Sequence, residues 1–305
     1  MLELFRALFD GPAAWRDHPE RGLLRVTGAD RVRFLNGMLS ADVAALREGD
    51  TAHALQLDRK GHVLAEVEVI ALAGEIWIDV ARSTEAALAG ALERHIIADA
   101  VLVESLSSDW GQLSIEGPDA ARAAAELGAP ELVPGRAQRA GELLWLGGGA
   151  LLSEGVRAIG PLPALAELRA RIGLPEIGDD AALILRIEAG RPLLGVDTGE
   201  RTFPQEARLE RTAVSFKKGC YIGQEIVARI QSRGGVNRLL VKLSADAAVA
   251  PGDEIAVSGR SSGRITSSAL SPVSGPIALG YVRPDDAAPG TPVRIGSIAG
   301  VVLET

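Results

Sequence analysis

The sequence predicts an α+β protein in which two related α/β units are followed by a small antiparallel β-barrel. Residues 23–34 read as a strand, a glycine turn, an aspartate at a helix start and a helix, and residues 112–122 repeat this order. After about Asn237, short β-rich runs alternate with Pro-Gly and Ser-Gly turns at regular spacing, which is typical of a barrel or sandwich. We therefore expect three domains, at residues 1–108, 109–236 and 237–305.

Apolar periodicity predicts the elements of each domain. In the first unit, strands are expected at 51–57, 63–72, 75–80 and 101–106, with a helix at 84–97. In the second unit, we expect strands near 142–146 and 155–159 and helices at 162–172 and 179–188. The last of these helices should end at the sequence Ala-Gly-Arg-Pro. The predicted barrel strands are 238–243, 254–258, 264–268, 277–282, 292–295 and 300–303.

Composition excludes several classes of protein. Of 305 residues, 47% are hydrophobic and 24% are charged, which is typical of a soluble globular protein rather than a disordered or fibrous one. One cysteine cannot form an internal disulfide, and with four scattered histidines it gives no metal-site spacing. Residues 1–10 lack the features of a secretory signal, and no apolar run is long enough to span a bilayer. We therefore expect a cytoplasmic protein with no membrane contact and no metal site of its own.

The single cysteine, Cys220, lies in residues 216–225, which read FKKGCYIGQE. The chain has only four lysines, and two of them, Lys217 and Lys218, stand close to this thiol. Neighbouring ammonium groups favour the reactive thiolate, so the segment predicts a functional cysteine. Free cysteines are also often buried and inert, and both interpretations stay open on the residues alone.

Positive charge is concentrated around this cysteine. Residues 201–238 contain eight basic and three acidic residues, a net charge of +5, although the net charge of the chain is −8. A local positive region on an acidic protein attracts anionic ligands to one place. The alternative is a set of paired, solvated surface charges.

Four stretches of the chain resemble one family. Residues 216–225 resemble the K-G-C-Y-x-G-Q-E signature of the YgfZ-type folate-binding proteins, which are relatives of the glycine-cleavage aminomethyltransferase, or T-protein. Residues 185–190 (LRIEAG) resemble the R-x-E-A-G segment of both branches. The motif at 28–35 and the barrel segments at 263–267 and 278–280 extend the resemblance over essentially the whole chain.

The resemblance implies that the two α/β (ferredoxin-like) units and the barrel surround a central channel that binds tetrahydrofolate or a one-carbon derivative. It also implies that Glu188 holds the pterin. A carboxylate can accept two hydrogen bonds from the N–H edge of an aminopyrimidinone, so the chemistry is coherent. Without the resemblance, Glu188 would be interpreted as an exposed acid at a helix end.

The cysteine segment and the residues after it supply the other expected folate contacts, which are Lys218, Tyr221, Gln224 and Arg229. Tyr221 is expected either to stack on the pterin or to be buried at the barrel edge. Gln224 is expected either to contact the ligand or to cap a helix. Arg191 and Asp197 follow Glu188 closely, and they are expected either to line the channel or to form a loop salt bridge.

One departure from the family pattern bears on activity. In the aminomethyltransferases the turn after the second strand reads G-G-x-x-D-D, whereas residues 61–66 here read Gly-His-Val-Leu-Ala-Glu. One acid is replaced by Ala65 and the other by Glu66, whose side chain is one methylene longer. Catalytic geometry is sensitive to such a change. We therefore do not expect an ordinary aminomethyltransferase.

The YgfZ-type branch is associated with the maturation or repair of iron–sulfur enzymes, including enzymes that modify tRNA. The resemblance therefore predicts a tetrahydrofolate-binding accessory factor whose partners are iron–sulfur assembly proteins or client enzymes, with Cys220 as the functional thiol. The first alternative is a tetrahydrofolate-dependent aminomethyltransferase or other one-carbon transferase that uses Glu66 or Asp58. The second is a tRNA-binding module, but the acidic chain and the few aromatic residues in its basic segment argue against direct nucleic-acid binding.

Overall fold

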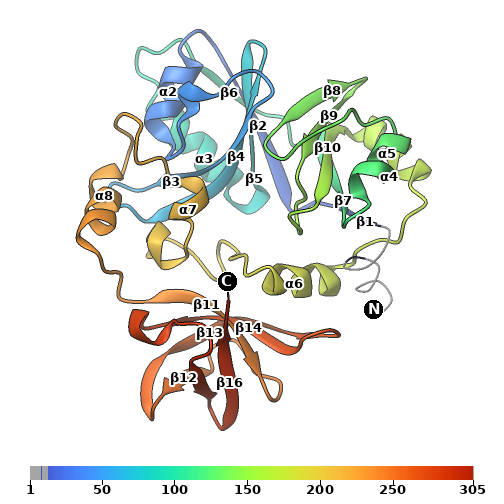
Figure 1. The fold of residues 1–305 in the computed structure, drawn as a ribbon. Coiled ribbons are helices and arrows are strands. Elements are labelled where there is room, and N and C mark those ends of the chain that lie inside the picture. Colours follow the sequence, from blue (N-terminus) through green and yellow to red (C-terminus); the bar gives the residue numbers. More distant parts are fainter. Residues whose placement is uncertain (1–7, 9–12, 305) are drawn as a thin grey trace.

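Two antiparallel sheets and a closed barrel make up the computed structural model, which describes residue 8 and residues 13–304 (Figure 1). Within these residues, each sheet has five strands and the barrel has six. The predicted α+β class and the C-terminal antiparallel barrel are confirmed. The segment expected to lack a secretory signal, residues 1–10, lies outside the described residues except for Leu8.

The first sheet has the strand order β3-β4-β5-β2-β6. In β4, alternate residues such as Ala65 and Val67 are buried against the helices, whereas Glu66 and Glu68 point to the opposite face. This second face is turned toward the rest of the molecule. The unit contains β2 (Arg21–Thr27), α2 (Arg31–Met38), β3 (Thr51–Leu57), β4 (Val63–Leu72), β5 (Glu75–Ala81), α3 (Arg82–Glu93) and β6 (Leu102–Ser105).

The second sheet has the order β1-β7-β10-β9-β8 and includes a strand from the start of the chain. β1 (Ala14–Asp17) pairs with β7 in the position that β6 occupies beside β2 in the first sheet. One edge strand of the second sheet, β1, therefore comes from the part of the chain that precedes the first unit. The remaining elements are β7 (Trp110–Glu116), α4 (Ala120–Glu126), β8 (Ala137–Ala140), β9 (Leu143–Gly147), β10 (Gly155–Pro161) and α5 (Leu162–Arg171).

Three helices connect the second unit to the barrel. α6 (Asp179–Glu188) packs on barrel strands β13 and β14, and Figure 1 shows it between the second unit and the barrel. α7 (Glu210–Ala213) packs on β3, and Tyr221 and Val227 join the apolar cluster of Leu55 and Leu57. α8 (Gln224–Arg233) follows the cysteine. Two segments thus pack outside the unit in which the sequence places them: β1 joins the second sheet, and the cysteine segment packs on the first unit.

The barrel closes in the order β11-β14-β13-β12-β15-β16. Alternate residues of β11, among them Val241 and Leu243, fill its interior, while Leu240 on the other face packs with α6. The barrel strands are β11 (Leu239–Ala245), β12 (Glu254–Val257), β13 (Arg260–Ser271), β14 (Gly275–Val282), β15 (Pro292–Ile295) and β16 (Ile298–Leu303).

The repeated glycine turns exist, but the expected aspartate caps do not form. Gly28 and Gly117 have φ of +106° and +109°, a conformation that suits glycine, and a helix begins shortly after each. The Asp30 carboxylate, however, accepts a hydrogen bond from the Ala100 backbone N–H at 2.8 Å rather than from the helix start. This aspartate therefore joins the helix start to the segment before β6.

Candidate functional site

The carboxylate of Glu188 lies at the C-terminal end of α6. Its Oε1 atom is buried and has no hydrogen-bond partner among the residues that the structure describes. The backbone carbonyl of the same residue accepts a hydrogen bond from Lys242 Nζ of β11 at 2.9 Å. An unsatisfied buried carboxylate oxygen is unfavourable by roughly 1–3 kcal/mol, and a ligand N–H would satisfy it.

The loop after α6 is fixed to the barrel by Asp197, which is buried. Its carboxylate accepts hydrogen bonds from Arg186 Nη1 at 2.5 Å and from the Leu193 backbone N–H at 2.9 Å. It also accepts from Thr266 and Ser267 of β13, at 2.5 and 2.7 Å. Asp197 thus forms an ion pair with Arg186 of α6 rather than with Arg191, and it holds the Glu188 segment in place.

Arg191 projects from this loop toward the second unit. Its Nη1 donates to the Ala150 carbonyl at 2.8 Å, and burial lowers the pKa of its guanidinium while the nearby Glu116 raises it. The Glu116 carboxylate in turn accepts the backbone N–H groups of Ala150, Leu151 and Leu152 at 2.8–3.1 Å. A buried carboxylate therefore positions the loop that holds Arg191.

The face of the first sheet that is turned toward the second unit carries paired charges. Arg157 of β10 forms ion pairs with Glu68 of β4 and with Asp79 of β5, the latter at 3.3 Å. Beside this cluster, Glu66 Oε1 lies 2.9 Å from His53 Nε2, although the angle is not that of a hydrogen bond. His53 Nδ1 is 3.1 Å from the Thr212 hydroxyl of α7. The Glu66 carboxylate therefore has the His53 imidazole as a close neighbour.

The cysteine loop is attached to α2 along its length. Cys220 is exposed. On one side of it, Ser215 N–H donates to the Ser40 carbonyl at 2.9 Å, and on the other, Ile222 N–H donates to the Gly37 carbonyl at 3.2 Å. Of the two interpretations of Cys220, the one in which the thiol is buried and inert does not agree with this exposure.

Lys218 is buried, with 8% of its surface exposed, and its ammonium is directed into the protein. Nζ donates to the carbonyls of Asn36, Leu39 and Ala41 at 2.5, 2.7 and 2.6 Å, which uses all three of its N–H groups. Burial lowers the pKa of Lys218 to about 8, and the charge of Asp42 opposes this shift. The ammonium therefore satisfies carbonyls at and beyond the C-terminal end of α2.

Tyr221 is also buried, but on the first unit and not at the barrel edge. Its ring lies 5.0 Å from Lys218 Nζ, and burial raises the pKa of its phenol to about 12. The hydroxyl has no hydrogen-bond partner in the described part of the chain. The ring packs in the apolar cluster of this unit.

The start of α8 lies close to the turn between β3 and β4, and a glycine stands on each side of this contact, Gly223 before α8 and Gly61 in the turn. Gly223, which precedes α8, has φ of +84°, and a Cβ placed there would lie 2.5 Å from the Asp58 carbonyl oxygen. Gly61, in the turn between β3 and β4, has φ of +83°, and its Cβ would lie 3.2 Å from Ile226 of α8. The start of α8 therefore approaches the turn too closely for larger residues.

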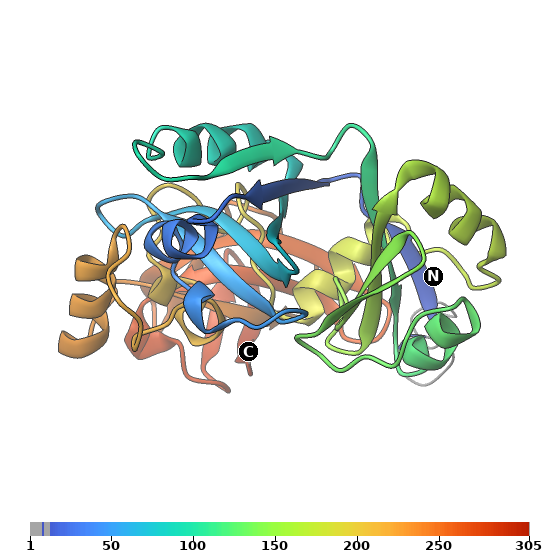
Figure 2. The same ribbon diagram turned by 90° about the horizontal axis from the view of Figure 1, so that it is seen from above.

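The predicted site residues form two groups. Lys218, Cys220 and Tyr221 share one loop, and Gln224 is the first residue of α8, with its N–H donating to the Tyr221 carbonyl at 3.2 Å. Arg229 is exposed and forms an ion pair with Glu225 at 2.7 Å. Glu188 forms the second group and lies at the end of α6. α8 lies at the outer side of the first unit, whereas α6 lies near the second unit (Figures 1 and 2).

Two charged residues near α7 were missed by sequence reasoning. Arg208 has φ of +61° and donates from Nε to the Leu240 carbonyl of β11 at 3.2 Å. Glu210 is mostly buried, its Oε2 lacks a partner among the described residues, and burial raises the pKa of its carboxyl. No sequence signal marks either residue, since both lie in an ordinary charged stretch.

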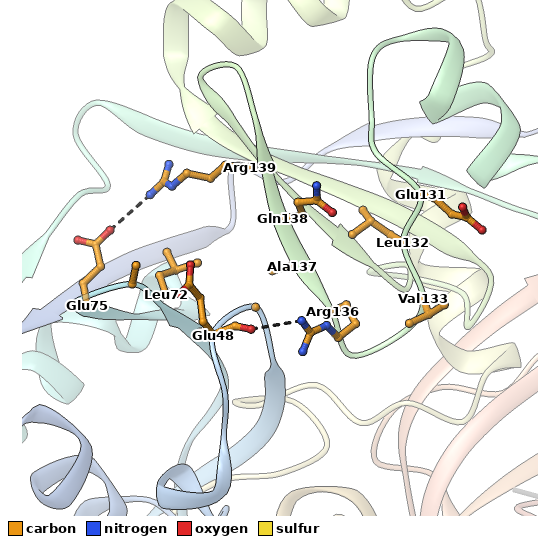
Figure 3. A pocket seen from close by; sticks show the side chains of 12 residues that line it. Glu48, Leu72, Glu75, Glu131, Leu132, Val133, Arg136, Ala137, Gln138 and Arg139 are labelled. Carbon is orange, nitrogen blue, oxygen red and sulfur yellow. Dashed lines mark hydrogen bonds and ion pairs between the residues drawn. The ribbon is translucent and has the colours of Figure 1, made fainter.

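A separate cleft of about 790 Å³ lies at the outer rim, between the two sheets (Figure 3). Arg139 and Glu75 are 3.4 Å apart across it, and Arg136 donates to the Glu48 carbonyl at 3.2 Å. None of the predicted site residues lines this cleft. In residues 13–304, no helix is long and apolar enough to cross a membrane, and no group of three or more potential ligands is arranged to hold a metal ion.

Comparison with family models relates the chain to the glycine cleavage T-protein at both ends. The GCVT N-terminal domain matches residues 13–133, and the glycine cleavage T-protein C-terminal barrel domain matches residues 238–304. The chain therefore belongs to the glycine cleavage T-protein superfamily, to which the YgfZ-type proteins also belong.

Relatives of several kinds match at similar identity. A chloroplastic protein of Arabidopsis thaliana, named as a transferase, is 28% identical over 97% of this chain and 71% of its own length. The aminomethyltransferase of Saccharopolyspora erythraea is 28% identical over 92% of this chain and 81% of its own. The tRNA-modifying protein YgfZ of Klebsiella pneumoniae is 28% identical over 91% of this chain and 87% of its own.

A solved structure shares the fold. The glycine cleavage system aminomethyltransferase T of Bartonella henselae superposes with a TM-score of 0.87 and 26% identity, covering 96% of this chain and 85% of that one. The arrangement of two α/β units and a barrel is therefore that of the T-proteins.

Proposed function

We propose that this protein is a tetrahydrofolate-binding accessory factor for the assembly or repair of iron–sulfur proteins, including enzymes that modify tRNA. The observation that carries the proposal is the buried Glu188 Oε1 atom, which has no partner in the described residues. A pterin offers adjacent N–H donors that suit this carboxylate, so the residues present fit the cofactor. The similarity to tRNA-modifying YgfZ proteins supports the cellular role.

The cysteine loop supports a role toward a partner protein. Cys220 is exposed on a loop that α2 holds at several points, so the thiol is presented outward in a fixed position. Its task would be to ligate iron transiently, or to attack the outer sulfur of a persulfide on the partner, so that a new S–S bond forms on Cys220, the partner's S–S bond breaks and the partner's thiolate leaves. We propose that Lys218 shapes this loop, since its N–H groups are already engaged, and that Tyr221, Gln224 and Arg229 also act through the loop and α8.

A tetrahydrofolate-dependent one-carbon transferase is the second candidate. The contact between Glu66 and His53 favours it, because it places a carboxylate and an imidazole side by side on the face of the first sheet that is opposite its helices. Aminomethyltransferases are also among the relatives. Formation of methylene-tetrahydrofolate from an aminomethyl donor by the purified protein would establish this candidate.

Calorimetric titration with tetrahydrofolate tests the folate assignment. We expect the wild-type protein to bind and Glu188→Ala to lose at least about tenfold in affinity, because the pterin N–H groups lose a charged acceptor. Glu167→Ala, which removes an exposed acid of α5 away from the predicted site residues, is the matched control and should bind as the wild type does. Absence of wild-type binding would remove the folate proposal, and unchanged binding by Glu188→Ala would remove the pterin contact.

Replacement of Cys220 tests the accessory role. Cys220→Ser should fold and bind tetrahydrofolate normally, because the side chain is exposed, but it should no longer support iron–sulfur enzymes in cells that lack the protein. The activity of an iron–sulfur tRNA-modifying enzyme in those cells is the measurement. Full support by the serine variant would contradict a role for the thiol.

A further inference from the structure

We propose that Arg208 is a second recognition point of the folate site, where it binds the carboxylates of the glutamate tail and so distinguishes folates from free pterins. The inference rests on the proposed function, because Glu188 is there assigned to the pterin.

The backbone of Arg208 is in an unfavourable conformation. With φ of +61°, it lies in the left-handed region that glycine and asparagine adopt readily and arginine does not. The residue is placed between the 3₁₀ turn Pro204–Glu206 and α7, and both of its neighbours, Ala207 and Leu209, are buried. An arginine kept where glycine would fit better is consistent with a task for the side chain.

The Arg208 guanidinium has no ion-pair partner among the residues that the structure describes. It is partly buried, and no carboxylate lies within 4.0 Å of it in the described residues. Burial lowers the pKa of the group, the charge of Arg211 lowers it further, and the charge of Glu210 partly opposes this shift. Glu210 does not form an ion pair with it, since Glu210 Oε1 instead lies 3.7 Å from Arg211 Nε. Partly buried arginines are normally paired, so the group is suited to an external anion.

Arg208 and Glu188 are both hydrogen-bonded to the same strand, β11. Arg208 Nε donates to the carbonyl of Leu240, and Lys242, two residues further along β11, donates to the carbonyl of Glu188. Leu240 packs in one apolar cluster with residues of α6, and Lys242 contacts the last residue of that helix. A single elongated ligand that places its pterin at Glu188 could therefore present an anionic tail to Arg208.

The test compares two ligands that share the pterin and differ in the tail. Tetrahydrofolate and 6-methyltetrahydropterin, which lacks the p-aminobenzoylglutamate, are titrated into the wild type, Arg208→Gly and Arg211→Ala. Glycine suits the positive φ, so Arg208→Gly should melt at the wild-type temperature or above. It should lose about tenfold in affinity for tetrahydrofolate and less than twofold for the small pterin. Arg211→Ala, exposed and close by, should lose less than threefold for either ligand.

Each other outcome contradicts a specific statement. If Arg208→Gly keeps the wild-type preference for tetrahydrofolate, or if the wild type binds both ligands equally, the assignment of Arg208 is wrong and the folate proposal stands. If the wild type binds neither ligand, the proposed function fails. Inorganic phosphate is titrated as a third probe. Phosphate binding that Arg208→Gly abolishes, with unchanged tetrahydrofolate affinity, would assign the arginine to free phosphate and overturn the role in tail recognition.

Discussion

At the scale of single residues, Lys218 shows that a lysine beside a cysteine need not act on it. Its ammonium donates to three carbonyls at and beyond the end of α2, and its burial has an electrostatic consequence. The pKa of about 8 in the folded protein is below the value of about 10.4 expected in the unfolded chain. The unfolded state therefore binds more protons between these two values.

We predict a pH-dependent stability difference between the wild type and Lys218→Met. Below pH 8 the lysine is charged in both states, and loss of its hydrogen bonds should destabilise the variant by roughly 2–4 kcal/mol. Between pH 8 and 10 the free energy of unfolding of the wild type should rise relative to the variant by about 1 kcal/mol per pH unit. Urea unfolding at several pH values measures this, with the exposed Lys217→Met as a flat control. A relative fall with pH would contradict the assignment.

At the scale of elements, the contact between α8 and the turn at Gly61 positions the whole cysteine segment. Both glycines have positive φ; a Cβ at Gly223 would clash with a backbone oxygen, and one at Gly61 would be in tight contact with α8. Gly223, three residues after the cysteine, is therefore required by backbone packing rather than by access to the thiol.

Alanine substitution of two glycines in the same segment separates these explanations. Gly223→Ala should destabilise the protein by at least about 2–3 kcal/mol, since its Cβ would meet a backbone oxygen at 2.5 Å and its φ is unfavourable. Gly219→Ala should change stability by less than about 0.5 kcal/mol, because nothing lies within 4 Å of its Cβ. Thermal unfolding measures both, and equal effects would contradict this account.

Elements with strong periodicity could be predicted from the sequence, whereas those fixed by tertiary contacts could not. β3, β4 and α6 have the expected limits because their apolar patterns are long and regular. β1 has four residues, and its partner is about a hundred residues away, so no local pattern marks it. Glu188 was identified through resemblance, but the direction of the Lys218 ammonium depends on α2 and has no signal in the sequence.

At the scale of the whole molecule, β1 joins the two α/β units. Trp15 of β1 belongs to the apolar core of the second unit, with Leu113 and Ile115 of β7. A separately expressed fragment of residues 109–173 would therefore lack one edge strand of its sheet.

Trp15→Ala should weaken the second unit more than the first. We expect a loss of about 3–5 kcal/mol, because the side chain is buried and leaves a cavity. Hydrogen exchange is the measurement, and amides of β7 and β10 should exchange faster while those of β4 and β5 change less. Uniform acceleration over both sheets would show that the units unfold together.

The return of β1 to the second sheet has a consequence for the order of events during synthesis. The first sheet has all five of its strands once β6 has left the ribosome, whereas β1 is synthesised well before β7 and its neighbours, with which it pairs. Pairing over such a separation carries a larger entropy of chain closure and is slower than pairing of neighbours. We therefore expect β1 to be among the last strands to pair, although it is synthesised before its partner.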